Sequence, residues 1–306
     1  MTETDAPKQP PGDETRVFRF APSPNGYLHR GHAFSALLNQ RAAAATKGRL
    51  LLRIEDIDLT RARPHFEAAI QADLGWLGLT WDAPVLKQSE RLHAYREALA
   101  RLDALDLLYP AFLTRAEVRA RVAALEQEGR WPRDPDGAPH YPGPERDWPQ
   151  ARRTREMASG RAYALRLDMK RALAGRAALT WREADPFRAR TEEAIVVDPA
   201  AWGDVVLARK DVPGSYHLSV VVDDQFQGVT DVVRGSDLRP ATSVHRLLQA
   251  LLGLPAPRYF HHRLIRDETG AKLAKSRGSE TIRARREAGE SAEALIAGLA
   301  LEHYAP

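Results

Sequence analysis

The sequence predicts an α/β fold built on an open parallel sheet, and its first 60 residues contain the pattern that predicts it. VFRFA (17–21) is a short apolar run typical of a strand, and a turn rich in proline and glycine follows it. GHAFSALLNQRAAAATKG (31–48) is rich in alanine and ends in glycine, as a capped helix does. RLLLRIEDID (49–58) then predicts a second strand. Because ligands of such sheets bind at the carboxyl ends of the strands, Glu55 and its acidic neighbours mark the expected ligand edge.

Apolar spacing and turn residues predict the remaining elements. Amphipathic helices are expected at 64–78, 89–110 and 114–129, the last with a capping box formed by Thr114 and Glu117, and a further helix at 241–253 closed by Gly253. Strand-like runs occur at 162–167, 192–197, 204–209, 216–224 and 229–235. Residues 131–149 are too rich in proline for regular structure and predict an extended loop. Residues 258–276 predict a hairpin around 268–270 that leads into a lysine-bearing loop.

Composition restricts the class of protein. The chain has 306 residues, enough for about two domains, and 43% of them are hydrophobic and 28% charged, as in a globular protein. No apolar run approaches the length of a membrane span, and the polar, proline-rich residues 1–15 predict a disordered lead rather than a signal peptide, so we expect a cytoplasmic protein. Cysteine is absent, which excludes disulfides and thiolate metal sites. The net charge of +4 is only a weak indication of a polyanionic partner.

Two histidines three residues apart, in HRGH (29–32), are the first candidate site. A zinc site would need further ligands at compatible spacing, and a buried structural pair is the ordinary alternative. The motif follows a predicted strand and begins a predicted helix, where unpaired amides and the helix dipole favour phosphate. Gly31 removes a side chain where a ligand can approach the backbone. The position therefore favours a phosphate cradle made by His29 and His32.

A second motif, KLAKS (272–276), supports the interpretation of HRGH as a nucleotide-binding motif. Together HRGH and KLAKS resemble the signature pair of the class I aminoacyl-tRNA synthetases, a family with a Rossmann-type nucleotide-binding fold. In that family the first motif holds ATP and the second brings lysines to the triphosphate. The resemblance thus implies ATP binding by His29, Gly31, His32 and Lys275, with His29, His32, Lys272 and Lys275 as catalytic residues. A serine is usual in the family where this chain has Ala274.

Four separated blocks narrow the resemblance to the glutamyl branch. RFAPSPNGYLHRGH, RIEDID, VVVDDQFQGVTDVVRGSDL and RYFHHRLIRDETGAKLAKS are similar to blocks of that branch and follow in the same order. Arg19 suits the side-chain carboxylate of glutamate, because a guanidinium binds a carboxylate through two hydrogen bonds, and Glu55 suits the ammonium group. The resemblance completes the glutamate pocket with Ala21, Pro22, Ser23, Tyr216 and Arg234. Magnesium is expected with ATP, bound mostly through phosphate and water.

The resemblance also predicts a domain organisation. We expect the catalytic domain in two halves at 16–105 and 191–255, an inserted acceptor-type module at 106–190, and the KLAKS loop with a short helical segment at 256–306. Only 30 residues follow Ser276, which is enough for one helix and a tail but not for the anticodon-binding domain of glutamyl-tRNA synthetases. The chain therefore resembles the truncated paralogues of that branch, the glutamyl-queuosine tRNA(Asp) synthetases. They activate glutamate without tRNA and transfer it to queuosine in the anticodon of tRNA(Asp).

Zinc is where this chain departs from those paralogues, which commonly bind the metal in the inserted module with three cysteines and a tyrosine. The corresponding positions here are Ala111, Leu113, Tyr141 and Glu145, so no thiolate ligand is present and zinc is not expected.

The predicted partners are L-glutamate, ATP and the anticodon stem-loop of tRNA(Asp), with a monomer expected. Arg152, Arg153 and Arg155 of the module are candidates for contacts with the RNA backbone or, alternatively, belong to a solvated face. Three alternatives stay open: a truncated conventional glutamyl-tRNA synthetase, another nucleotidyltransferase with an HxGH cradle, and a tRNA-binding protein that retains the fold without catalysis.

Overall fold

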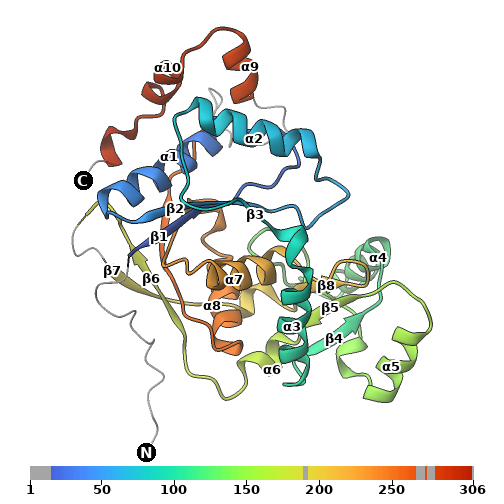
Figure 1. Ribbon diagram of the computed structural model, residues 1–306. Helices are drawn as coiled ribbons and strands as arrows, with labels where there is room; N and C mark the ends of the chain where they lie inside the picture. Colours follow the sequence, from blue (N-terminus) through green and yellow to red (C-terminus); the bar gives the residue numbers. More distant parts are fainter. Residues whose placement is uncertain (1–14, 189–191, 267–272, 274–279, 305–306) are drawn as a thin grey trace, which may run out of the picture.

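A parallel strand, helix and strand unit begins the fold, as Figure 1 shows. The computed structural model describes residues 15–188, 192–266, 273 and 280–304. Strand β1 (Val17–Phe20) pairs in parallel with β2 (Arg49–Ile54), and α1 (Arg30–Ala45) connects them. Strand β3 (Leu86–Lys87) extends this sheet beyond β2, in the order β1-β2-β3.

A second group of strands continues from β1. It has the order β7-β6-β10-β9 and comprises β6 (Thr180–Ala184), β7 (Glu192–Val196), β9 (Asp231–Gly235) and β10 (Arg258–His262). The pairs β9–β10 and β10–β6 are parallel, and β6–β7 is antiparallel. The backbone N–H of Thr230 donates to the carbonyl of Val17 at 3.0 Å, so β9 starts beside β1. The carboxyl ends of β1, β2 and β9 therefore lie at one edge. The boundary predicted between residues 190 and 191 would separate β6 from β7, but these two strands pair with each other in one sheet.

A third, antiparallel sheet forms a separate layer at the lower right of Figure 1. Its order is β4-β5-β8, with β4 (Leu108–Ala111), β5 (Ala164–Leu167) and β8 (Val206–Arg209). It carries α4 (Arg115–Leu125), α5 (Gln150–Ala158) and α6 (Met169–Leu173). The capping box predicted for Thr114 and Glu117 is confirmed: the Glu117 amide donates to Thr114 Oγ1 at 3.2 Å, and the Thr114 amide donates to Glu117 Oε2 at 2.7 Å.

The remaining elements cover these sheets. The helices are α2 (Pro64–Trp76), α3 (Leu92–Asp103), α7 (Tyr216–Phe226), α8 (Thr242–Leu251), α9 (Ile282–Glu287) and α10 (Ala292–Ala297). The 3-10 turns are η1 (Gln88–Arg91), η2 (Glu145–Asp147), η3 (Ala200–Trp202), η4 (Ser236–Leu238) and η6 (Leu301–Tyr304). One core lies around Phe18 and Phe34, both fully buried, and a second packs α3, α7 and α8 around Leu218 and Leu247. No helix in the described part of the chain is long and apolar enough to cross a lipid bilayer.

The strand predicted at 216–224 is wrong, because these residues begin helix α7. Leu218, Val220, Val221, Asp223 and Asp224 are all buried. A helix covered on nearly all sides loses the polar face that produces the 3.6-residue period, so its run of valines imitates a buried strand.

Two predicted helix ends also differ. The helix predicted at 89–110 ends at Asp103, and Asp106, with φ of 54°, turns the chain into β4. Helix α1 ends before Gly48, and the left-handed residue there is Lys47, with φ of 52°. Gly48 is required for another reason: a Cβ at this position would lie 2.5 Å from the carbonyl oxygen of Arg16. By contrast, Gly253 has φ of 62° directly after α8, as the predicted glycine closure requires.

The segment after Ser276 differs as well. Instead of one helix and a tail, its described residues form α9 and α10, separated by Gly289 with φ of 88°. The hairpin predicted around 268–270 lies outside the described residues.

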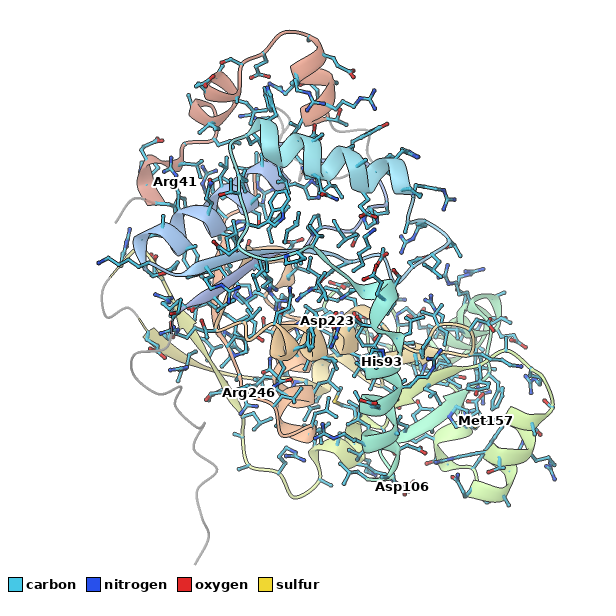
Figure 2. All side chains as sticks on the ribbon, in the orientation of Figure 1. Arg41, His93, Asp106, Met157, Asp223 and Arg246 are labelled. Atoms are coloured by element: carbon cyan, nitrogen blue, oxygen red, sulfur yellow. The ribbon has the colours of Figure 1, made fainter. Side chains whose placement is uncertain are left out.

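Asp223 joins α7 to α3, and Figure 2 labels it near the middle of the molecule. Its side chain is fully buried and accepts hydrogen bonds from Arg91 Nε at 2.6 Å, Tyr95 Oη at 2.6 Å and Gln88 Nε2 at 3.1 Å. Removal of the carboxylate would leave a buried guanidinium and a buried hydroxyl without this acceptor.

We predict that Asp223→Ala lowers the free energy of unfolding by about 3–5 kcal/mol, the usual cost of breaking a buried ion pair from one side. Urea unfolding followed by circular dichroism measures it. The control is Asp103→Ala, which removes an exposed carboxylate at the end of α3 and should cost less than about 0.5 kcal/mol. Equal losses for the two variants would contradict the prediction.

Candidate active site

A cleft of about 440 Å³ opens at the carboxyl ends of β1, β2 and β9. Every site residue predicted from the sequence that the structure describes lines this cleft: Arg19, Ala21, Pro22, Ser23, His29, Gly31, His32, Glu55, Tyr216 and Arg234. The other two, Lys272 and Lys275, lie outside the described residues. The residues come from β1, the turn after it, α1, the end of β2, α7 and β9. The fold thus gathers segments more than 200 positions apart at one sheet edge.

The two histidines cap helix α1 with their own rings. His29 is the N-cap residue, and its Nδ1 accepts from the amide of Gly31 at 3.1 Å. Nδ1 of His32 accepts from the amide of His29 at 3.1 Å. Because Nδ1 is the acceptor in both rings, a neutral imidazole carries its proton on Nε2. Each ring is therefore in the tautomer that donates from Nε2, as a phosphate ligand requires.

Gly31 serves this cap directly. A Cβ at Gly31 would lie 3.0 Å from Cε1 and 3.1 Å from Nδ1 of His29. Its amide, which the sequence suggested for a ligand, donates to His29. The glycine is thus explained by the close approach of the His29 ring.

The segment that contains Lys275 is bounded by described residues at the cleft. Leu273 lines the cleft, and its amide donates to the carbonyl of Ile265 at 3.5 Å. On the other side, Thr281 forms a β-bridge with His29, and the Ile282 amide donates to the carbonyl of Leu28 at 2.8 Å. The described residues on the two sides of 274–279 therefore lie at the cleft and next to His29.

A buried carboxylate that the sequence analysis missed, Asp224, pairs with Arg19, which lines the cleft, and with Arg53. Oδ1 of Asp224 accepts from Arg19 Nε at 3.1 Å and from Arg53 Nη1 at 2.7 Å. The Arg53 side chain is 0% exposed and also donates to Gln227 Oε1 at 2.9 Å. Burial alone would raise the pKa of Asp224, but the attraction of Arg19 and Arg53 outweighs it and holds the pKa below its ordinary value. Asp224 is therefore an anion that orients both guanidinium groups.

Glu55 is placed by the same network. Arg53 Nη2 donates to Glu55 Oε1 at 3.3 Å, and the Glu55 amide donates to the carbonyl of Pro22 at 3.1 Å. Burial raises the pKa of Glu55 above its usual value, although Arg53 and Arg19 oppose this rise. A cation bound in the cleft would stabilise the ionised carboxylate, so the site favours an ammonium group next to Glu55.

A second cleft of about 760 Å³ adjoins the first and shares Ser23, Asn25, Glu55 and Tyr216 with it. Its far side is formed by α4 and the region of β8, and includes Arg115 and Arg209. The two clefts therefore lie next to each other, one at the edge of the parallel sheet and one toward the antiparallel sheet.

The residues at the predicted zinc positions do not fit a metal. Tyr141 Oη accepts from the amide of Leu113 at 3.1 Å, and Glu145 Oε1 accepts from the amide of Phe112 at 3.2 Å. The remaining two positions are Ala111 and Leu113, which have no ligand atom in their side chains. No group of three or more His, Cys, Asp or Glu side chains suited to a metal occurs in the described residues. The polar side chains at the predicted zinc positions thus form hydrogen bonds with backbone amides.

The family model for the catalytic domain of class I tRNA synthetases of the E and Q type matches residues 16–306. The chain therefore belongs to this family, which confirms the fold class that the sequence predicts. A relative from Rhodobacter capsulatus named "Glutamyl-Q tRNA(Asp) synthetase" is 47% identical, and the match covers 90% of this chain and 96% of that protein.

Two further relatives are longer than this chain. "Glutamate--tRNA ligase 2" of Acidiphilium cryptum is 39% identical, and the match covers 92% of this chain and 60% of that protein. The solved glutamate-tRNA synthetase of Elizabethkingia anophelis is 26% identical with a TM-score of 0.69, over 90% of this chain and 54% of that one.

We predict that the purified protein carries no stoichiometric zinc and folds without it, because Tyr141 and Glu145 are engaged by backbone amides and the other two positions have no donor. Elemental analysis after dialysis against a chelator measures this, together with the melting temperature before and after. One zinc per chain, or a large loss of thermal stability on chelation, would contradict it.

Proposed function

We propose that the protein activates L-glutamate with ATP, without tRNA, and then transfers the glutamyl group to queuosine in the anticodon of tRNA(Asp). The observation that supports this best is the convergence of all ten described candidate residues on one cleft. The relative from Rhodobacter capsulatus that bears the name glutamyl-Q tRNA(Asp) synthetase adds support, because it matches over 96% of its length.

The activation step requires little covalent work from the protein. An oxygen of the α-carboxylate attacks the α-phosphorus of ATP, and the bond from this phosphorus to the bridging oxygen breaks. The products are glutamyl-adenylate and pyrophosphate. Positioning of the reactants and stabilisation of the charge on the leaving group therefore account for the catalysis.

The part of the cleft around Arg19 and Glu55 would bind glutamate. Arg19 would bind the side-chain carboxylate, with its guanidinium oriented by Asp224, and Glu55 would bind the ammonium group. Ala21, Pro22, Ser23, Tyr216 and Arg234 would complete the pocket.

The part of the cleft around His29 and His32 would bind ATP. His29 and His32 would donate from Nε2 to the phosphates beside Gly31, at the start of α1. Lys275, and secondarily Lys272, would neutralise the charge that develops on pyrophosphate. Mg²⁺ would enter with the triphosphate and be held mostly by phosphate and water.

The acceptor base would occupy the second cleft. In the transfer step a hydroxyl of the acceptor attacks the acyl carbon of glutamyl-adenylate, and AMP leaves. Bases of an anticodon loop can be splayed from the stack into a pocket, and the exposed Arg115 and Arg209 at the rim suit the RNA backbone. Of the module arginines considered from the sequence, Arg153 is 6% exposed and donates to the carbonyl of Arg146, so it has a structural role. We further propose that the protein is a monomer and that it acts in the cytoplasm, where ATP, glutamate and tRNA occur.

A truncated conventional glutamyl-tRNA synthetase is the alternative, since the glutamate–tRNA ligase of Acidiphilium cryptum is 39% identical. The two functions share the activation step and differ in the acceptor, so the acceptor has to be tested separately.

We predict exchange of pyrophosphate into ATP that depends on glutamate and needs no tRNA. Lys275→Ala should slow it by about 10²-fold or more, because a charge that stabilises the transition state is lost. Lys170→Ala, which removes an exposed lysine of α6, should leave the rate unchanged. An unaltered rate in Lys275→Ala would refute the role of that lysine.

We further predict that radiolabelled glutamate is transferred to tRNA(Asp) that contains queuosine, and not to tRNA(Asp) or tRNA(Glu) from cells unable to make that base. Acid-precipitable label on purified tRNA measures the transfer. Equal labelling of queuosine-free tRNA(Glu) would identify the truncated conventional synthetase instead.

A further inference from the structure

Arg234 differs from the other arginine of the glutamate pocket in the charge of its neighbours. Its guanidinium donates to Thr242 Oγ1 at 2.7 Å and Tyr216 Oη at 3.3 Å, and it contacts His245 Nδ1 at 3.2 Å and His261 Nε2 at 3.3 Å. Among the described residues no carboxylate lies within ion-pair distance of Arg234, whereas Arg19 is paired with Asp224. Arg234 is therefore held by uncharged acceptors and keeps its full charge for a ligand.

His261 can accept from Arg234 only because of its other neighbour. Its Nδ1 lies 2.8 Å from Glu183 Oε2, a carboxylate that can only accept, so the ring proton belongs on Nδ1 and the lone pair on Nε2. Glu183 is itself fixed, since Trp181 Nε1 donates to Oε2 at 2.9 Å and the His261 amide donates to Oε1 at 2.8 Å. Burial lowers the pKa of His261, Glu183 opposes this, and Arg234 adds to the lowering.

His245 completes the arrangement from helix α8. It is 1% exposed, and its Nε2 lies 3.3 Å from Nδ1 of His217, which leaves Nδ1 of His245 to accept from Arg234. Burial lowers the pKa of His245 well below its ordinary value, and Arg234 lowers it further. The imidazoles around Arg234 are thus neutral acceptors.

We propose that Glu183 and His261 are positioning residues, which hold Arg234 in the cleft as an uncompensated cation and thereby set the affinity for an anionic amino acid. Glu183 lies one imidazole away from the guanidinium, so it orients the acceptor without pairing with Arg234. This inference rests on the proposed function, because it assigns the charge that glutamate meets in the same pocket.

The test is pyrophosphate exchange with glutamate and ATP varied separately. Glu183→Gln removes the charge that fixes the tautomer of His261 and keeps the shape of the side chain. We expect the KM for glutamate to rise about tenfold, the effect of one lost hydrogen bond to a charged group, with the KM for ATP within about twofold. The matched control is Glu193→Gln, the exposed partner of Glu183 on β7, which should change neither value.

A second pair of variants separates positioning from folding. His261→Gln can place an amide oxygen where Nε2 stood, whereas His261→Leu offers Arg234 no acceptor, so the KM for glutamate should rise clearly less in the glutamine variant. Melting temperatures monitor folding. An unchanged KM for glutamate in Glu183→Gln and His261→Leu, even with a lower melting temperature, would overturn the inference. Wild-type protein without glutamate-dependent exchange would instead overturn the proposed function.

Discussion

The carboxylate of Asp224 is the interaction on which the cleft depends. It comes from α7 and binds Arg19 of β1 and Arg53 of β2, and Arg53 in turn contacts Glu55. The pairing joins helix α7 to the carboxyl ends of β1 and β2, where the cleft opens. Arg53 is fully buried, so its charge requires this compensation. The positions of Arg19 and Glu55 therefore depend on Asp224, which does not itself line the cleft.

The charges of the pocket add up in a way that suits its proposed ligand. Arg19 and Arg53 are balanced by Asp224 and Glu55. Arg234 then remains as one unbalanced positive charge, surrounded by neutral acceptors. Glutamate, with two carboxylates and one ammonium group, carries one net negative charge. These three arginines and two carboxylates thus match the proposed ligand in net charge, and the carboxylate of Asp237 lines the cleft outside this group.

Much of the site could be predicted from the sequence because its residues lie in short motifs at the ends of strands. His29, Gly31 and His32 follow one strand, and Glu55 ends the next. The supporting residues could not be found in this way, since Asp224 lies 171 positions from Arg53 and Glu183 lies 78 from His261. Only the fold brings such pairs together. The sequence predicts a strand where helix α7 lies, because burial on nearly all sides removes the helical period. A carboxylate within its apolar run was nevertheless a signal of a buried ion pair.

Ordinary hydrogen bonds, and no thiolate ligands, are present at the positions where the resemblance places a zinc site. Tyr141 and Glu145 bind consecutive amides after β4, and Arg166 of β5 stacks over the Tyr141 ring at 4.2 Å. Burial raises the pKa of Tyr141 to about 12, so the phenol stays protonated. These contacts connect the loop at 131–149 to the antiparallel sheet, which forms one side of the second cleft.

Glutamate and ATP are proposed to bind in one cleft, and a crystal structure with a non-hydrolysable glutamyl-adenylate analogue provides the sharpest test of this arrangement. We expect the analogue to lie in this cleft, with its side-chain carboxylate on Arg19, its ammonium group on Glu55 and its phosphate on His29 and His32. A bound analogue without contact to Arg19 and Glu55, or one that lies outside the cleft, would contradict it.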